Sequence, residues 1–310
     1  MLKRIPLPIT GVMLGCAALG NLLQSYSEGV RFVFGVISAL LGVLFLIKLF
    51  GDFESVKKDM ENPMLASISG TFPMALLLLA AYAKPLSAGL GVALWWVGLL
   101  LHVCLIVWFT AKYVAHFNLK QVFPSWYIVY VGIAAASVSA PAFGMEGIGT
   151  VCLWFGLVTF VLITVAVISR YAKVGEPPVP ARPVFCIMTA PASLCVAAYV
   201  QSVTPKSQAL LVCMEIVATV LFVVVLTQLP RFLKNTAFAP SYAAYTFPFV
   251  ITAIALKQTM ACLAKMGAPA PWLGPIVLIE TIVATVLVLY ALIRFLMHIF
   301  GGEKPAQQAA

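Results

Sequence analysis

The chain has 310 residues, of which 63% are apolar and 9% are charged, and its formal net charge is +9. With a mean hydropathy of +1.05, it carries more apolar surface than a soluble core of this length could bury, which excludes an ordinary soluble globular protein and indicates an integral membrane protein. We expect no nucleic-acid partner, because no basic run is interleaved with aromatic residues.

Charged or turn-rich breaks divide the chain into ten apolar segments, each close to the roughly 20 residues that a helix needs to cross a bilayer. We therefore expect transmembrane helices over 6–24, 30–50, 65–83, 88–112, 124–141, 147–169, 183–202, 207–229, 244–264 and 272–299. The first segment is not followed by a small-residue cleavage site, so we interpret it as a span and not as a signal peptide. Residues 1–310 are expected to form a single transmembrane domain.

The distribution of cations predicts the orientation. With the N-terminus in the cytoplasm, only Arg31, Lys84, Lys206 and Lys265 fall on the outer side, Lys257 lies within the ninth segment, and the other fourteen of the 19 cations fall on the inner side. This bias satisfies the positive-inside rule and predicts that both termini are cytoplasmic. The outer connections are short and the inner ones are longer, so the expected repeating unit is a helical hairpin, present five times.

The odd and even segments differ in the size of their residues. Odd segments are rich in small residues, such as Gly11 and Gly15 in the first, whereas even segments are rich in bulky aliphatic and aromatic residues. Small residues allow helix backbones to approach each other, and bulky apolar residues are compatible with lipid. We therefore expect an all-α membrane protein with quasi-fivefold symmetry, in which an inner ring of odd helices is surrounded by an outer ring of even helices.

A Thr-x-Pro pattern recurs in the odd segments. It comprises Thr71, Phe72 and Pro73 in the third, Thr189, Ala190 and Pro191 in the seventh, and Thr246, Phe247 and Pro248 in the ninth. Pro124 in the fifth segment, and Pro6 or Pro8 in the first, are weaker counterparts. Proline inside a helix frees a carbonyl and bends the axis, and in lipid a freed carbonyl must face protein or water. The pattern favours kinks around a water-lined axis, the alternative being tolerated kinks in a solid bundle.

No pattern in the sequence indicates an enzyme. His102, His116 and His298 do not pair with a nucleophile by spacing, and the seven cysteines stand singly in apolar runs. The chain also lacks a phosphate-binding glycine loop and a Walker-type lysine. We expect no catalytic residue, no metal site and no cofactor.

The polar groups inside the segments are candidate sites for an anion. Lys257 lies ten residues after Phe247, about 15 Å further along a helix, where it could raise anion occupancy in an outer vestibule or could extend to the lipid headgroups. Hydroxyl groups could replace part of an anion's hydration shell, which predicts selection by dehydration cost. The candidate hydroxyls belong to Thr71, Thr189, Thr246 and Thr252.

Two carboxylates lie within apolar segments, Glu215 in the eighth and Glu280 in the tenth. A charge exposed to lipid would be costly, so both side chains should point inward or into a subunit contact. They are interpreted either as a proton site for coupled transport or as hydrogen-bonded braces between helices.

Three stretches carry a family resemblance: Tyr245–Pro248, Thr189–Ser193, and Arg4–Pro6 followed by Gly11 and Gly15. They resemble the tellurite-resistance TehA proteins and the related plant guard-cell slow anion channels, in a family that also includes C4-dicarboxylate and sulfite transporters. The resemblance covers nearly the whole chain in span number and proline placement, and the absence of long hydrophilic tails resembles the bacterial members.

The resemblance implies a homotrimer in the bacterial inner membrane, with a pore through each protomer that is formed by the five odd helices. It also implies that a phenylalanine closes this pore, and matching the motif assigns that role to Phe247. The residues alone do not rank Phe247 above Phe72, which precedes proline in the same way. The implied permeant ions are small inorganic anions such as chloride, nitrate and tellurite.

Three classes of function are therefore considered. The favoured one is a gated anion channel, in which the ring of Phe247 must move for conduction. The alternative is a secondary transporter of tellurite, a dicarboxylate or a lipophilic cation, with Glu215 or Glu280 carrying a coupling proton. A non-transporting scaffold is disfavoured by the prolines on one ring. Five similar hairpins also lack the inverted pair of broken helices found in many carriers.

Overall fold

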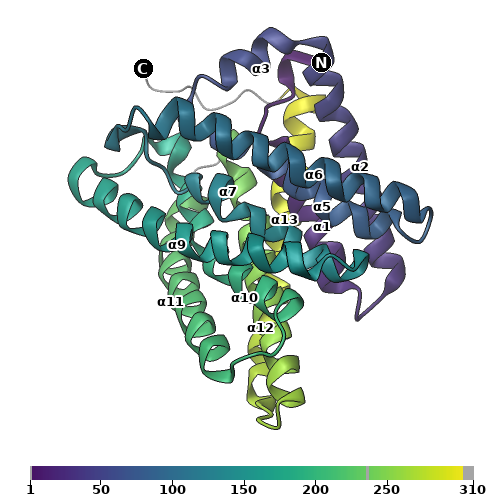
Figure 1. Ribbon diagram of the computed structural model, residues 1–310. Coiled ribbons are helices and arrows are strands. Elements are labelled where there is room, and N and C mark those ends of the chain that lie inside the picture. Colours follow the sequence, from purple (N-terminus) through teal and green to yellow (C-terminus); the bar gives the residue numbers. More distant parts are fainter. Residues whose placement is uncertain (1, 235–236, 303–310) are drawn as a thin grey trace.

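The computed structural model describes residues 2–234 and 237–302, and in these ranges the elements are helices, with no β-strand (Figure 1). Eight helical stretches are long and apolar enough to cross a membrane. They are Glu28–Gly51 (α2), Pro63–Ala83 (α4, Pro63–Ile68, and α5, Thr71–Ala83), Ala88–Val114 (α6, Ala88–Phe109, and η2), Glu146–Val174 (α9), Val179–Ser202 (η6, Val179–Thr189, and α10, Ala190–Ser202), Gln208–Leu233 (α11), Pro240–Lys265 (η7, Pro240–Tyr245, and α12, Phe247–Lys265) and Pro271–Gly301 (η8, Pro271–Leu273, and α13, Gly274–Gly301). The all-helical, multi-pass character expected from composition is confirmed.

The first and fifth expected segments are shorter or interrupted. The first is α1 (Ile9–Leu23), which begins only after Pro8. The fifth, expected as one helix over 124–141, consists of four short pieces: α7 (Trp126–Tyr130), η4 (Gly132–Ala134), α8 (Ala135–Ser139) and η5 (Ala140–Phe143). The expectation of a continuous helix was wrong here, because the chain tightens into 3₁₀ turns at Gly132 and Ala140. A further short helix, α3 (Phe53–Asp59), lies in the connection between α2 and α4.

The turns that lead into α2, α6 and α11 share one capping device. Ser27, Ser87 and Ser207 each precede the helix, and each side chain accepts a hydrogen bond of 3.3 Å from the backbone N–H three residues later. A serine at this position satisfies one of the backbone donors that a helix start leaves unpaired. The same local chemistry therefore starts three of the helices that follow short connections.

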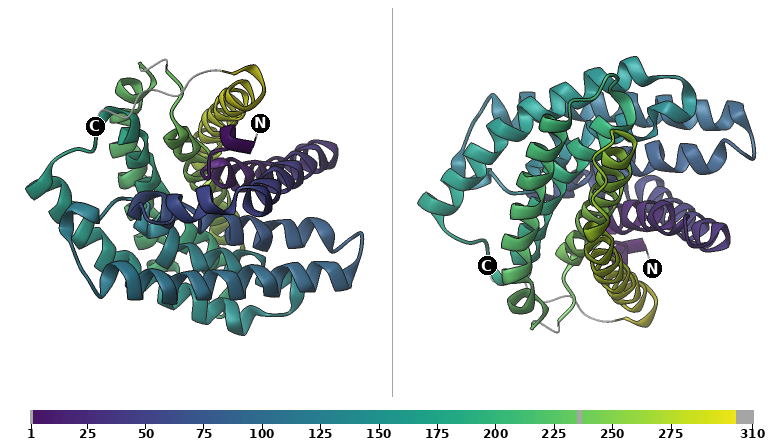
Figure 2. Two further views of the ribbon diagram at one scale, coloured as in Figure 1. Left: turned by 90° about the horizontal axis from the view of Figure 1, so that it is seen from above. Right: turned by 90° about the horizontal axis from the view of Figure 1, so that it is seen from below.

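Five of the helices form a closed ring of contacts. Helix α1 contacts α5, α5 contacts α8, α8 contacts α10, α10 contacts α12, and α12 contacts α1. Helices α2, α9, α11 and α13 each pack against their own hairpin partner and against the next member of the ring, as α2 does against α1 and α5. Helix α6 packs against α5 and against α7 and η4 of the interrupted fifth segment. Figures 1 and 2 show α12 and α13 side by side, and likewise α1 and α2.

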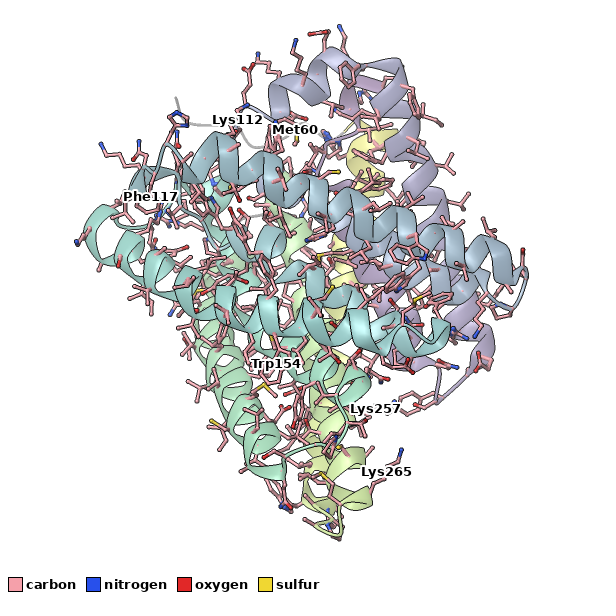
Figure 3. All side chains as sticks on the ribbon, viewed as in Figure 1. Met60, Lys112, Phe117, Trp154, Lys257 and Lys265 are labelled. Atoms are coloured by element: carbon pink, nitrogen blue, oxygen red, sulfur yellow. The ribbon has the colours of Figure 1, made fainter. Side chains whose placement is uncertain are left out.

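Burial separates the ring helices from the others. In α1 every residue except Asn21 and Leu23 is buried, and in α10 every residue except Val200 and Gln201 is buried. By contrast, α2, α6, α9, α11 and α13 carry many exposed large apolar side chains, such as Trp154 on α9 (Figure 3). The expected division into small-residue helices inside and bulky apolar helices outside is therefore what the burial pattern shows.

Candidate functional site

The Thr-x-Pro pattern lies at the points where the α-helices α5, α10 and α12 begin. Pro191 is the second residue of α10 and Pro248 is the second residue of α12, while Pro73 is the third residue of α5. Before α12, Thr246 has φ −97° and ψ −97°, which is outside the helical region. A proline in the first turn has no intrahelical hydrogen bond to lose, and a bend of the longer helical stretch at each of these prolines stays a prediction. Pro124 likewise stands two residues before α7 and is buried.

Each threonine hydroxyl of the pattern forms a hydrogen bond to the backbone of the preceding turn. The Oγ1 atoms of Thr71, Thr189 and Thr246 each donate to the carbonyl three residues earlier, over 2.8, 3.3 and 2.7 Å. Thr10 in α1 repeats the contact with Leu7 at 3.0 Å. The carbonyls of Leu7 and Ala243 also accept the backbone N–H groups of Thr10 and Thr246, both at 3.2 Å, so there the hydroxyls reinforce turns that the backbone already forms.

The same hydroxyls also connect neighbouring helices of the ring. Thr71 Oγ1 lies 2.7 Å from Thr10 Oγ1, Thr246 Oγ1 lies 2.9 Å from the Gly11 carbonyl, and Thr252 accepts from Ser193 at 3.3 Å. That the hydroxyls of Thr189, Thr246 and Thr252 replace anion hydration stays a prediction, and the following contacts do not favour it. The three hydroxyls are buried, engaged within the protein, and absent from the walls of the cavities described next.

Two cavities lie inside the ring. The first cavity, of about 50 Å³, is mostly apolar, and its walls come from the first, third, fifth, seventh and ninth segments, the fifth contributing residues of α7 and η4 and not of α8. Its lining includes Gly11, Thr71, Tyr127, Gly132, Ile187, Pro191, Leu194, Ala243, Phe247 and Pro248. Because every ring segment contributes to it, the cavity lies within the ring and not between the ring and the outer helices.

The second cavity is larger, about 290 Å³, and its wall is more polar. It lies near the opposite ends of the same helices, where α1 leads into α2, and it is also lined from all five ring segments. The polar lining residues are Asn21, Gln24, Arg31, Ser139, Gln201 and Gln258.

Phe247 and Leu194 line both cavities. Their side chains are 6% and 2% exposed, so they occupy the space between the two cavities. Phe247 is the first residue of α12, directly after the break at Thr246. A bulky apolar pair therefore separates the cavities, and one member stands at a discontinuity of the backbone.

The two phenylalanines that precede proline have different surroundings. The ring of Phe72 packs against Phe45 of α2 with 4.9 Å between the centroids, and it lines neither cavity. Phe247 faces the axis. The structure thus distinguishes two residues that local sequence alone did not rank.

Gly11 and Gly15 allow α1 to approach the break before α12. A Cβ atom placed on Gly15 would lie 2.4 Å from the Cβ of Thr246 and 3.1 Å from the Phe247 nitrogen, and one on Gly11 would lie 3.0 Å from the Cβ of Ala243. Such close contacts exclude any larger residue at Gly15 without displacement of the backbone. The small residues of α1 therefore help to position Phe247.

Lys257 does not line either cavity. Its Nζ atom donates to the carbonyl of Leu22 at 3.1 Å and to the hydroxyl of Ser25, and it lies 5.0 Å from the ring centre of Tyr26. It thus connects α12 to the end of α1, and Figure 3 shows Lys257 on the same helix as Lys265. These contacts make Lys257 a brace between helices, and a role for it near an outer vestibule stays a prediction.

Glu215 and Glu280 are buried beside α12. Thr259 Oγ1 donates to Glu215 Oε2 at 2.8 Å, and Glu280 lies near enough for the two carboxyls to interact electrostatically. Among the described residues Glu280 Oε2 has no hydrogen-bond partner. Neither carboxyl lines the two cavities, so both lie outside the axis of the ring.

The interpretation of the sequence missed Arg31 and Leu194. Arg31 was placed on the outer side, at the start of the segment expected over 30–50, and in the structure it lies in α2 and lines the second cavity. Leu194 is one aliphatic residue among many, and its position opposite Phe247 depends on how α10 and α12 pack. No local signal in the sequence identifies either of them. Within the described ranges, no group of three or more His, Cys, Asp or Glu side chains could hold a metal ion.

A lipid-facing layer of apolar helices around a ring that encloses cavities defines a multi-pass helical membrane protein of the transport class. Residues 4–296 match the model of the SLAC1 family, described as voltage-dependent anion channel. The chain belongs to this family, whose members are channels and transporters and not enzymes. No curated protein matches the chain.

Proposed function

We propose that the chain is an anion channel whose conduction path runs through the ring and is closed by Phe247. The observation that carries this proposal is the pair of cavities in series on the ring axis, with the side chains of Phe247 and Leu194 between them. The anion transport of the family supports the class of permeant ion. Conduction then requires the Phe247 ring to leave the axis, and the discontinuity at Thr246 gives the start of α12 a place to turn.

The repeated contacts support a finer architecture: ten spans in five hairpins with quasi-fivefold symmetry. From the resemblance noted above we also propose a homotrimer in the bacterial inner membrane, with both termini cytoplasmic and the second cavity facing outward. Chloride, nitrate and tellurite are the proposed permeant anions. Selection would rest on dehydration in the narrow, mostly apolar first cavity, because weak ligation allows an ion to leave as well as enter.

The first prediction concerns Phe247. Replacing it with alanine removes the ring that separates the cavities, so Phe247→Ala should raise anion current at least about tenfold in patch-clamp recordings, a change equivalent to about 1.4 kcal/mol. The matched control is Phe72→Ala, which removes the same ring from a phenylalanine that also precedes proline but faces α2. Equal currents from a well-inserted Phe247→Ala protein and the parent would contradict the gate assignment.

One observation favours a second function, proton-coupled secondary transport. Glu215 and Glu280 are both buried, and an oxygen of Glu280 has no hydrogen-bond partner among the described residues. A pair of this kind can bind a proton inside a membrane. The cargo would be tellurite, a dicarboxylate or a lipophilic cation. The position of both carboxyls outside the cavity walls makes this the second choice.

A further inference from the structure

The second cavity carries one formal charge in its lining. Arg31 is the only Lys, Arg, Asp or Glu among the residues that line it, and the other polar groups there are neutral amides and a hydroxyl. Gln258 contributes a buried Oε1 atom that has no hydrogen-bond partner among the described residues. The cavity therefore combines a cation with several side chains able to form hydrogen bonds to a guest.

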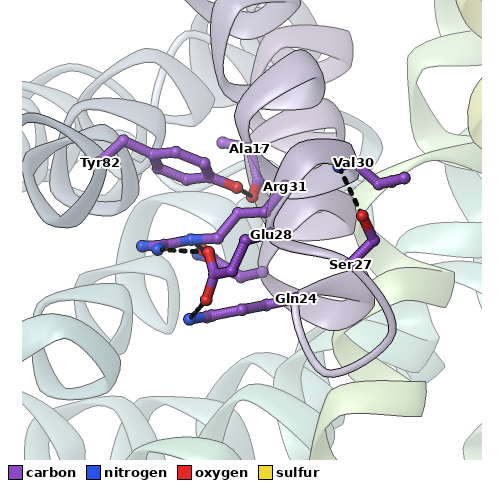
Figure 4. Close-up of polar contacts among 8 residues, drawn as sticks. Ala17, Gln24, Ser27, Glu28, Val30, Arg31 and Tyr82 are labelled. Atoms are coloured by element: carbon purple, nitrogen blue, oxygen red, sulfur yellow. Dashed lines mark hydrogen bonds and ion pairs between the residues drawn. The ribbon is translucent and has the colours of Figure 1, made fainter.

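Arg31 is held in place by its neighbours and is not a freely moving surface cation. Its guanidinium lies 4.7 Å from the ring centre of Tyr82, and its Nε donates to Asn21 Oδ1 at 3.3 Å. Tyr82 is itself anchored, because its hydroxyl donates to the Ala17 carbonyl at 2.7 Å (Figure 4). The side chain of Arg31 is only 19% exposed.

Two glycines make room for this arrangement. A Cβ atom on Gly20 would lie 2.3 Å from the Tyr82 hydroxyl, and one on Gly35 would lie 2.5 Å from its ring. Tyr82 therefore fits between α1 and α2 only because both positions lack a side chain. The orientation of Arg31 is built into the packing of the first two hairpins.

The positive charge of the Arg31 guanidinium is only weakly compensated by the nearby carboxylate of Glu28. Arg31 Nη1 lies 3.4 Å from Glu28 Oε2, which is longer than a strong charge-assisted hydrogen bond, and the Glu28 side chain is 68% exposed. Glu28 Oε1 accepts a 2.7 Å bond from Gln24, another lining residue (Figure 4). An ion pair with this separation and one solvent-exposed partner is weak. An anion that enters the cavity could therefore take the place of the Glu28 carboxylate beside the Arg31 guanidinium.

We propose that Arg31 binds incoming anions in the second cavity, after they displace Glu28, and that it favours planar oxyanions over halides. The inference rests on the channel function proposed above. A guanidinium presents parallel N–H donors that match a planar oxyanion, whereas a spherical halide uses only the charge. A cation in a cavity with low-dielectric walls also raises the local anion concentration.

The test uses the Phe247→Ala protein, so that entry and not the gate limits the current. Arg31→Gln should raise the outer nitrate concentration that gives half-maximal current about tenfold, as expected for losing one charge-assisted hydrogen bond. Arg31→Lys keeps the charge but not the planar donors, so it should lower the nitrate-to-chloride permeability ratio while retaining chloride affinity. Glu28→Gln should lower the half-maximal nitrate concentration about twofold.

The matched control is Lys265→Gln, which removes the same charge from an exposed residue outside the cavity (Figure 3). Arg31→Cys separates loss of charge from loss of packing: a cationic methanethiosulfonate added outside should restore nitrate affinity, and an anionic one should not. If Arg31→Gln and Glu28→Gln give the same half-maximal nitrate concentration as Lys265→Gln, the role of Arg31 is overturned while the channel function stands. Absence of anion current in the Phe247→Ala parent would overturn the channel function and this inference together.

Discussion

At the scale of single residues, Glu176 illustrates how one carboxylate joins separate parts of the chain. Its oxygens accept from both Nη atoms of Arg231 at 2.7 and 2.8 Å, and Arg182 Nε lies 3.1 Å from Oε2. The bond from Arg231 holds the pKa of Glu176 below its ordinary value of 4.5. Glu176 thereby ties the connection before η6 to the end of α11.

Glu176→Gln is expected to lower the thermal unfolding midpoint at neutral pH by about 2 °C or less, because exposed pairs contribute at most about 1 kcal/mol. A lowered folded-state pKa means that the stabilisation is fully present above the ordinary pKa and is lost as the pH falls through the folded-state pKa. The parent and the variant should therefore converge in acid. Differential scanning fluorimetry in detergent across pH measures this, with Glu54→Gln on the exposed face of α3 as the control. A difference that persists in acid would contradict the electrostatic origin.

The residue scale also shows where sequence information runs out. The motif containing Phe247 could be recognised, and its family match carries the class of function. The contrast with Phe72 required the structure, because the direction of a side chain depends on how its helix is rotated against its neighbours. Arg31 was missed for the same reason: its sequence position near a turn gives no sign that it faces the cavity.

At the scale of elements, the approach of α1 to the start of α12 is the most constrained contact. A Cβ atom at Gly15 would be 2.4 Å from the Cβ of Thr246, a distance that real Cβ contacts do not reach. The residue before α12, Thr246, therefore packs directly against α1 at a position where only glycine leaves enough room. Small residues in the first segment indicated close helix packing, but not which partner they contact.

Gly15→Ala should destabilise the protein by about 1–3 kcal/mol, because the added methyl must displace Thr246 or α1. It should also raise the basal anion current, since Thr246 directly precedes Phe247. The matched control is Gly147→Ala in α9, where nothing lies within 4 Å of the added Cβ, and there helix propensity predicts a gain of about 0.5–1 kcal/mol. Chemical unfolding in detergent together with current recordings measures both effects. Equal stability changes at the two positions would disprove the tight fit.

At the scale of the whole molecule, the closed ring of contacts determines which groups an ion can meet. Glu215 and Glu280 lie beside α12 but outside both cavities, whereas Arg31 and Phe247 line the second one. Passive flow and coupled transport therefore require different roles of the two carboxyl groups. A channel needs them only as braces, and a carrier needs at least one of them to exchange a proton.

In liposomes with asymmetric chloride, the reversal potential should follow the Nernst potential of the anion, and an imposed pH gradient should not drive uptake. Glu215→Gln and Glu280→Gln should leave that reversal potential unchanged, because neither side chain lines the path. Uptake that a pH gradient drives in the parent, and that either glutamine variant abolishes, would reject the channel in favour of the carrier.

The sequence by itself determined the membrane class, the approximate positions of most spans, and the division between small-residue and bulky helices. These features follow from composition and from the length of apolar runs, which the bilayer constrains directly. Only the tertiary structure decided that Pro73, Pro191 and Pro248 stand in the first turn of α-helices, that the threonine hydroxyls bond to the preceding turn and to neighbouring helices, and that Arg31, not Lys257, lines the second cavity. Those outcomes depend on helix rotation and on contacts between residues far apart in the chain, which local sequence patterns do not encode.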